Sequence, residues 1–216
     1  VPYNEGLLIF GFAPQPGKIF EVYDRIALGG VGHPADVERL RMNLLDMAHL
    51  EGFNRSAQDV TSARLLQFGI APALKQNFEE IQRAPYIIRM LLVELDNEGK
   101  TNFFRMNYDG HWETFKNGTA IAGEEKVMDW LQTEIQKQPF ATYSLDQALK
   151  QACKLWDESR KLETDDEAKK DIPETLQEAF DQWYLEGAVL TEKSMRKAIY
   201  RPLSKSEIER LKSSAF

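Results

Sequence analysis

The stretch "KIFEVYDRIALGGVGHPADVERLR", residues 18–41, decides how this chain folds. Its first part is rich in β-branched and aromatic residues, which favour the extended conformation of paired strands. Pro34 suits the first turn of a helix, where a backbone N–H is not needed. Apolar residues then recur at spacings of three and four, as on one face of a helix: Val37, Leu40, Leu44 and Ala48. The stretch therefore predicts strands followed directly by a long helix, which we expect to stop at Gly52.

The residues just before this stretch superficially match a nucleotide-binding phosphate loop, because a Gly-Lys pair follows an earlier glycine. That loop requires four residues between the first glycine and the Gly-Lys pair, and a Ser or Thr after the lysine. Here five residues separate Gly11 from Gly17, and Ile19 follows Lys18. Two prolines in the segment also remove backbone N–H groups that would bind phosphate. The sequence therefore argues against a nucleotide as the ligand of Lys18.

Strand and helix patterns continue on both sides of this stretch. The run "GLLIF", residues 6–10, is typical of a strand. A second helix, kinked at Pro72, is predicted where one apolar face persists for several turns, and that face comprises Val60, Ala63, Leu66, Ile70, Leu74, Phe78 and Ile81. Three further strands are predicted in "YIIRMLLVEL", "TNFFRMNY" and "HWETFKNGTAIA", with turn-forming residues at 96–99 and 109–110 between them.

The residue pattern in the second half of the chain predicts two more helices, a strand and a short surface helix. Ser144 and Gln147 form a capping box at the start of the second of these helices. "WYLEGAVL", residues 183–190, is predicted to be the last strand, and "SKSEIERLKSS" the surface helix. Residues 158–175 are charged and lack an apolar period, as in a solvated loop or a helical excursion. Because helices come in pairs, simple crossovers between parallel strands are disfavoured, and we expect one antiparallel α+β layered domain over residues 1–216.

The composition of the chain disfavours several classes of protein function. The chain has 216 residues and a net charge of -7, which disfavours a general nucleic-acid binder. Its longest apolar runs fall short of the roughly 20 residues that a membrane span requires, and the first residues do not match a secretory signal. A single cysteine, Cys153, is consistent with a reducing cytosol, so we expect a cytoplasmic protein.

The sequence does not indicate a metal site, a cofactor site or a reactive thiol. Cys153 has apolar neighbours, which predict a buried small residue rather than a nucleophile. His33, His49 and His111 lie too far apart along the chain for a metal site, and carboxylates at ligand spacing are absent. We therefore expect no metal and no cofactor.

Residues 18–41 also resemble part of the proteasome family, and they are most similar to α-type subunits of bacterial proteasomes. "KIFEVYDRIALGGVGHPADVERLR" resembles that family's lysine-led strand, tight turn and first long helix. "DVTSARLLQ" resembles the start of its second helix, "FRMNYDGHW" a later strand and turn, and "LEGAVLTEKSMRKAIYRPLS" the last strand and tail. The resemblance implies a four-layer αββα sandwich of the N-terminal-nucleophile hydrolase type, assembled into stacked rings of seven.

The resemblance further implies that this chain is a non-catalytic subunit. Catalytic members of the superfamily cut peptides with an N-terminal Thr, helped by an Asp, an Arg and a Lys. The strand matching "GLLIFGFAP" carries the acid and the Arg in those members, and Phe12 and Pro14 stand there here. The catalytic Lys has no counterpart in "GFAPQPG", and a later Ser-containing turn resembles "GTAIAGEE", without the Ser. A catalytically active or self-assembling threonine peptidase remains the alternative, as does an unrelated binding domain.

The resemblance also implies the partners. An α-type subunit forms the outer ring that gates substrate entry, stacks on β subunits and docks a ring ATPase or other activator through the activator's C-terminal tail. Lys18 matches the lysine that pairs with the tail carboxylate, and Gly32 would leave room for the tail backbone. A solvated lysine is the alternative for Lys18. Family members also carry a gating segment, a first helix and a first strand before the position of Gly6, so we expect further N-terminal residues, or else a divergent subunit with an open pore.

Overall fold

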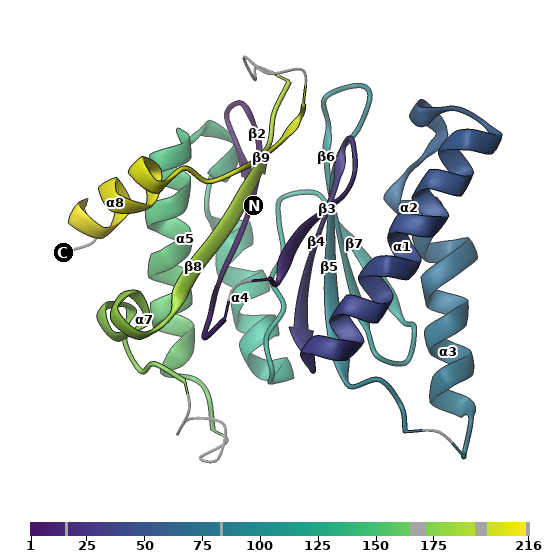
Figure 1. Cartoon of the computed structure of the whole chain (residues 1–216). Coiled ribbons are helices and arrows are strands. Elements are labelled where there is room, and N and C mark those ends of the chain that lie inside the picture. The colour runs from purple at the N-terminus through teal and green to yellow at the C-terminus, as the bar shows by residue number, and fades with distance from the viewer. Residues whose placement is uncertain (16, 83, 165–171, 193–197, 215–216) are drawn as a thin grey trace.

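Two antiparallel sheets form the centre of the chain (Figure 1). The computed structural model describes residues 1–15, 17–82, 84–164, 172–192 and 198–214. The first sheet has the strand order β1-β2-β8-β9, and its strands are β1 (Pro2–Tyr3), β2 (Gly6–Ala13), β8 (Tyr184–Leu190) and β9 (Tyr200–Pro202). The second has the order β3-β4-β5-β6-β7, made of β3 (Ile19–Tyr23), β4 (Ile26–Gly32), β5 (Ile88–Leu95), β6 (Thr101–Asn107) and β7 (Trp112–Phe115).

Helices cover the outer face of each sheet (Figure 1). The second sheet is covered by α1 (Pro34–Asn54), α2 (Ser62–Leu65), the π-helical turn η2 (Leu66–Ile70) and α3 (Ala71–Glu79). The first sheet is covered by α4 (Glu125–Lys137), α5 (Leu145–Arg160), α7 (Leu176–Gln182) and α8 (Lys205–Ser214). Two short 3-10 turns, η1 (Ala57–Asp59) and η3 (Phe140–Thr142), complete the described elements. The prediction of an α+β chain is confirmed.

Three apolar cores hold these elements together, and strand alternation explains how one strand serves two of them. In β2, Leu8 packs toward α4 and α5, whereas Leu7 and Ile9 pack between the sheets. In β4, Leu28 packs toward α1, whereas Ala27 lies between the sheets. Successive side chains of a strand point to opposite faces, so a strand buried on both faces reads as a continuous apolar run.

The second predicted helix is present but differs in two respects. The chain forms a π-helical turn immediately before Pro72, because a proline inside a helix cannot donate the usual backbone hydrogen bond. Phe78 and Ile81 do not belong to the buried face, since 46% and 101% of their surfaces are exposed. That part of the prediction was wrong because α3 ends at Glu79, so the helical period no longer applies to Ile81.

Two predicted element ends and the predicted last strand also need correction. The helix starting at Pro34 passes Gly52 and ends at Asn54. The third predicted strand ends at Phe115, and residues 116–122 are not extended into the sheet. β8 is not the last strand, because β9 pairs with its outer edge. The charged segment 158–175 and the tail motif 185–204 lie partly outside the described residues, at 165–171 and 193–197.

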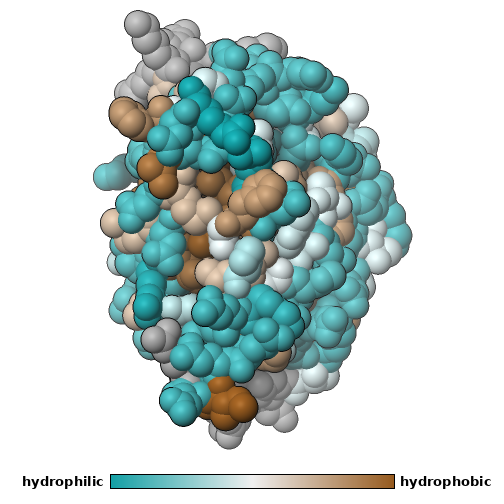
Figure 2. All heavy atoms as spheres, turned by 90° about the vertical axis from the view of Figure 1, so that its right-hand side faces the viewer, coloured by the Kyte–Doolittle hydropathy of each residue, from teal (hydrophilic) through white to brown (hydrophobic). Residues whose placement is uncertain are grey.

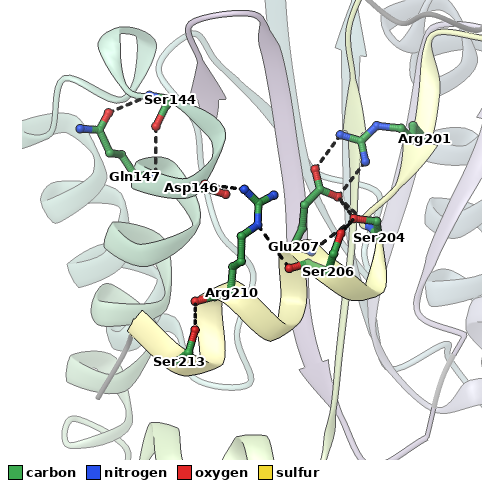
Figure 3. A network of polar contacts seen from close by, with 9 residues as sticks. All are labelled: Ser144, Asp146, Gln147, Arg201, Ser204, Ser206, Glu207, Arg210 and Ser213. Atoms are coloured by element: carbon green, nitrogen blue, oxygen red, sulfur yellow. Dashed lines mark hydrogen bonds and ion pairs between the residues drawn. The ribbon is translucent and has the colours of Figure 1, made fainter.

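The C-terminal helix α8 is anchored by ionic contacts (Figure 3). Arg201 donates two hydrogen bonds to the carboxylate of Glu207, at 2.8 and 3.0 Å. The backbone N–H and the hydroxyl of Ser204 each donate to the same carboxylate at 2.7 Å. Farther along the helix, Arg210 reaches Asp146 at the start of α5, next to the confirmed capping box of that helix. These contacts tie α8 both to β9 and to α5.

Glu207 should make the stability of the fold depend on acid pH. Burial alone would raise its pKa, but the hydrogen bonds from Arg201 and Ser204 outweigh burial and lower the pKa to about 2. A lowered carboxyl pKa stabilises the folded state above the unfolded pKa, and that stability is lost as the pH falls from about 5 toward 2. Glu207→Gln should lower the free energy of unfolding by about 2 kcal/mol at pH 7 and by less at pH 3. Urea unfolding measures both values.

A matched control separates this network from a general charge effect. Glu209→Gln removes the same charge from the exposed side of α8. We expect it to change the free energy of unfolding by no more than about 0.5 kcal/mol at either pH. Equal effects of the two substitutions would contradict the role of the Glu207 network.

Candidate functional site

Lys18 stands at the start of β3, where the chain crosses from the first sheet to the second. The carboxylate of Glu186, on β8, accepts hydrogen bonds from the backbone N–H groups of Gly17, Lys18 and Ile19. The Lys18 and Ile19 bonds measure 2.9 and 3.3 Å. On the other side, the Lys18 carbonyl accepts from the N–H of Gly30 at 3.1 Å. The backbone of Lys18 is therefore held by both sheets.

The Lys18 side chain is less constrained than its backbone. Its residue is half-buried, and within the described part of the chain no carboxylate lies at ion-pair distance from its ammonium. The carboxylate of Glu186 is already satisfied by backbone donors. Lys18 thus offers a cationic donor that the described residues do not neutralise.

An apolar cavity of about 300 Å³ lies beside Lys18. It forms where β2, the second sheet and the helices α4 and α5 meet, and Lys18 and Glu186 are among its lining residues. The rest of the lining is mainly apolar and includes Phe10, Leu131, Phe140 and Trp156. Arg160 also lines the cavity, but it is paired with Glu163. A cavity that has an unneutralised cation such as Lys18 at its border can bind an apolar group that carries a carboxylate.

Gly32 lies at the same end of the second sheet, since Gly30 is opposite Lys18 and Gly32 is two residues farther on. It does not line the cavity. Its φ is +139°, and a Cβ at this position would lie 2.4 Å from the carbonyl oxygen of Ile87. The need for glycine here therefore comes from within the chain, and room for a ligand backbone stays a prediction.

The positions that the resemblance assigns to a catalytic acid and arginine hold no ionisable group. Phe12 is 9% exposed, and its ring centroid lies 4.6 Å from that of Trp156 and 5.2 Å from that of Phe180. Pro14 is exposed just beyond the end of β2. Cys153 is buried, as predicted, and burial raises the pKa of its thiol to about 12. That thiol stays protonated near neutral pH and is a poor nucleophile.

Two of the three histidines have local structural roles. Nδ1 of His33 accepts from the backbone N–H of Ala35 at 3.3 Å, which caps α1. His49 packs edge-on against Tyr23 at 5.8 Å between centroids. Within the residues that the structure describes, no group of three or more His, Cys, Asp or Glu side chains could hold a metal ion. None of the described helices is long and apolar enough to cross a membrane.

Sequence reasoning missed Glu186 and Arg89. The Arg89 guanidinium donates to the carbonyls of Ala122 and Gly123, each at 2.5 Å, and so fixes a segment that borders the cavity. The only sequence signal for Glu186 is a charged residue inside the apolar strand "YLEGAVL". Nothing in the neighbouring residues indicates which distant groups Glu186 contacts.

Comparison with known proteins places these observations in a family. A family model described as proteasome subunit matches residues 13–172. A proteasome subunit alpha of Nocardioides sp. is 30% identical over 126 residues, 57% of this chain and 49% of that protein. The corresponding protein of Streptosporangium roseum is 32% identical over 131 residues, 58% of this chain and 49% of that protein. One from Acidothermus cellulolyticus is 32% identical over 108 residues, 50% of this chain and 46% of that protein.

The chain spans about half the length of these curated relatives. All three are alpha subunits of bacterial proteasomes, which confirms the resemblance to α-type subunits. The family model covers most of the chain, including the lysine-led strand, the helices α1 to α3 over the second sheet and the helices α4 and α5. This chain belongs to the proteasome subunit family.

Proposed function

We propose that this chain is a non-catalytic α-type subunit of a cytoplasmic proteasome core particle. In this proposal its single domain is an αββα sandwich of the N-terminal-nucleophile hydrolase type. Seven copies form the outer ring, which gates substrate entry and stacks on a ring of β subunits. Family membership and the alpha-subunit relatives support the proposal, as do the two facing sheets with helices outside them.

The outer face of the α1–α3 helices supports a role in assembly. Figure 2 shows brown apolar side chains on this face among teal polar ones. Large apolar residues that are exposed on these helices and the adjoining turn are Met42, Leu50, Phe53, Phe68, Phe78 and Tyr108. Exposed apolar groups of this size on one face are typical of a protein contact. We assign this face to contact with a partner subunit.

The absence of ionisable groups at Phe12 and Pro14 supports the non-catalytic part of the proposal. A hydroxyl nucleophile needs a neighbouring base and a tuning charge. Phe12 instead packs in an aromatic cluster with Trp156 and Phe180. An acid at that position would lie in an apolar core, where ionisation is disfavoured.

The proposal that an activator docks on this chain rests on one observation, the unneutralised Lys18 ammonium beside an apolar cavity. An activator tail that ends in apolar residues and a free carboxylate would complement both features. A charge-assisted hydrogen bond that is partly shielded from water is stronger than an exposed one. Lys18 would supply that bond and the cavity region would accept the apolar side chains.

The test uses the chain co-expressed with a β subunit. Native mass spectrometry should show seven-membered rings or ring stacks. Lys18→Ala should leave the rings intact and weaken activator binding by about tenfold or more, because a hydrogen bond to a charged group contributes about 1.5–3 kcal/mol. Lys18→Arg should restore only part of the affinity, since a planar guanidinium differs in shape from an ammonium. Binding is measured by titrating the activator into purified rings.

Lys205→Ala, which removes an exposed lysine from α8, is the matched control and should leave the affinity unchanged. Unchanged activator affinity in Lys18→Ala rings would return Lys18 to the role of a solvated lysine. A monomer at high concentration would contradict assembly. Stoichiometric labelling of this chain by a threonine-directed inhibitor would favour the peptidase alternative.

A further inference from the structure

We infer that Glu186 is a positioning residue for Lys18: it orients the lysine toward a ligand carboxylate while leaving the ammonium free. The inference rests on the proposed docking function of Lys18. It starts from one contact set, in which a single carboxylate on β8 accepts from three successive backbone N–H groups at residues 17–19. These donors belong to the segment that leads into β3, so the contact joins the two sheets at Lys18.

The local backbone explains how three donors converge on one carboxylate. Gly17 has a φ of +102°, in the region that glycine adopts without strain. Successive N–H groups around such a residue form a concave anion-binding arrangement. Both carboxylate oxygens are used, since Gly17 donates to Oε1 while Lys18 and Ile19 donate to Oε2. The negative charge of Glu186 is thereby stabilised by backbone dipoles rather than by a side-chain cation.

This arrangement matters for the ammonium of Lys18. Glu186 holds the lysine by its backbone, and the two side chains do not form an ion pair within the described residues. The lysine therefore keeps its charge available while its Cα is fixed at the border of the cavity. The Lys18 carbonyl also accepts a hydrogen bond from the N–H of Gly30, which holds the lysine backbone from the side of the second sheet.

Loss of the carboxylate charge should release the segment at residues 17–19. A glutamine side chain keeps one acceptor oxygen but places an NH₂ group where the second oxygen accepts a backbone N–H, so two donors would face each other. The starting direction of the Lys18 side chain then becomes variable. Affinity for a ligand carboxylate falls, whereas contacts of the ligand's apolar groups with the cavity persist.

The competing explanation for the Glu186 contacts is that they only connect the two sheets and do not position Lys18. Ligands with and without a terminal negative charge distinguish these two roles of Glu186. The probe is a fluorescein-labelled peptide that ends in Leu-Tyr-Leu with a free carboxylate, compared with the same peptide as its C-terminal amide. Rings assembled with the β subunit are titrated by fluorescence anisotropy. In Glu186→Gln rings the carboxylate peptide should bind about tenfold more weakly, and the amide peptide should bind as it does to unchanged rings. Glu186→Asp, which keeps the charge on a shorter side chain, should restore part of the affinity.

Two controls complete the design. Glu192→Gln removes the same charge beyond the other end of β8, where Glu192 pairs with Arg25, and should not affect either peptide. The double variant of Lys18→Ala and Glu186→Gln should bind the carboxylate peptide no more weakly than Lys18→Ala alone, because Glu186 acts through Lys18.

Each outcome has a separate meaning. Unchanged carboxylate-peptide affinity in Lys18→Ala rings would overturn the proposed docking function itself. A loss with Lys18→Ala but none with Glu186→Gln would overturn the inference about Glu186 alone. Equal weakening of both peptides by Glu186→Gln would assign Glu186 to the structural connection between the sheets. If Glu186→Gln does not assemble, the inference fails unless Glu186→Asp shows a selective loss for the carboxylate peptide.

Discussion

Replacing Phe12 with aspartate should destabilise the fold by at least about 4 kcal/mol, which for a marginally stable domain means that much of the protein unfolds. Phe12 packs against Trp156 and Phe180 in the core between the first sheet and its helices. Its removal leaves a cavity, and the new carboxyl group would be buried among apolar side chains. Circular dichroism during urea unfolding measures the loss, and the soluble fraction after expression gives a second readout.

Two control substitutions show whether burial at this site is the cause. Phe12→Leu keeps an apolar side chain and should cost no more than about 1.5 kcal/mol. Phe53→Asp makes the same chemical change on α1, where 88% of the phenylalanine is exposed, and should change stability by about 0.5 kcal/mol or less. A Phe12→Asp protein as stable as Phe53→Asp would mean that an acid can occupy the Phe12 position, which would weaken the non-catalytic proposal.

Replacing Gly32 with alanine should lower the free energy of unfolding by about 3 kcal/mol. The added Cβ would lie 2.4 Å from the carbonyl oxygen of Ile87 and 3.0 Å from the Cα of Ile88. Both are backbone atoms of β5 and its approach, so they cannot turn aside as a flexible side chain could. The φ of +139° adds strain for any residue with a Cβ. Chemical denaturation of the two proteins gives the difference.

Gly11→Ala is the matched control for this prediction. Gly11 lies in β2, and a Cβ built on it meets no atom within 4 Å. Alanine there should leave stability within about 0.5 kcal/mol, or raise it slightly by restricting the unfolded chain. Similar losses for the two glycine substitutions would contradict the collision at Gly32.

Much of the local structure could be predicted because its causes lie within a few residues. The helix that begins at Pro34 and the capping box of Ser144 and Gln147 depend on groups one to four positions apart. The turns at 96–99 and 109–110 follow from short-range backbone chemistry in the same way, with Gly99 and Gly110 donating to residues three positions earlier. Strands that are buried on both faces can also be recognised in the sequence, because they are continuous apolar runs.

The order and type of most elements, the α+β class and the family resemblance that the comparisons confirmed could therefore be predicted from the sequence. Three other features could be known only from the folded chain: the pairing of β2 with β8, the contact of Glu186 with the backbone of Lys18, and the approach of Gly32 to the carbonyl of Ile87. The Glu186 contacts join residues 167 to 169 positions apart. Such contacts arise only when distant segments of the chain pack together, so neither the spacing nor the composition of neighbouring residues records them.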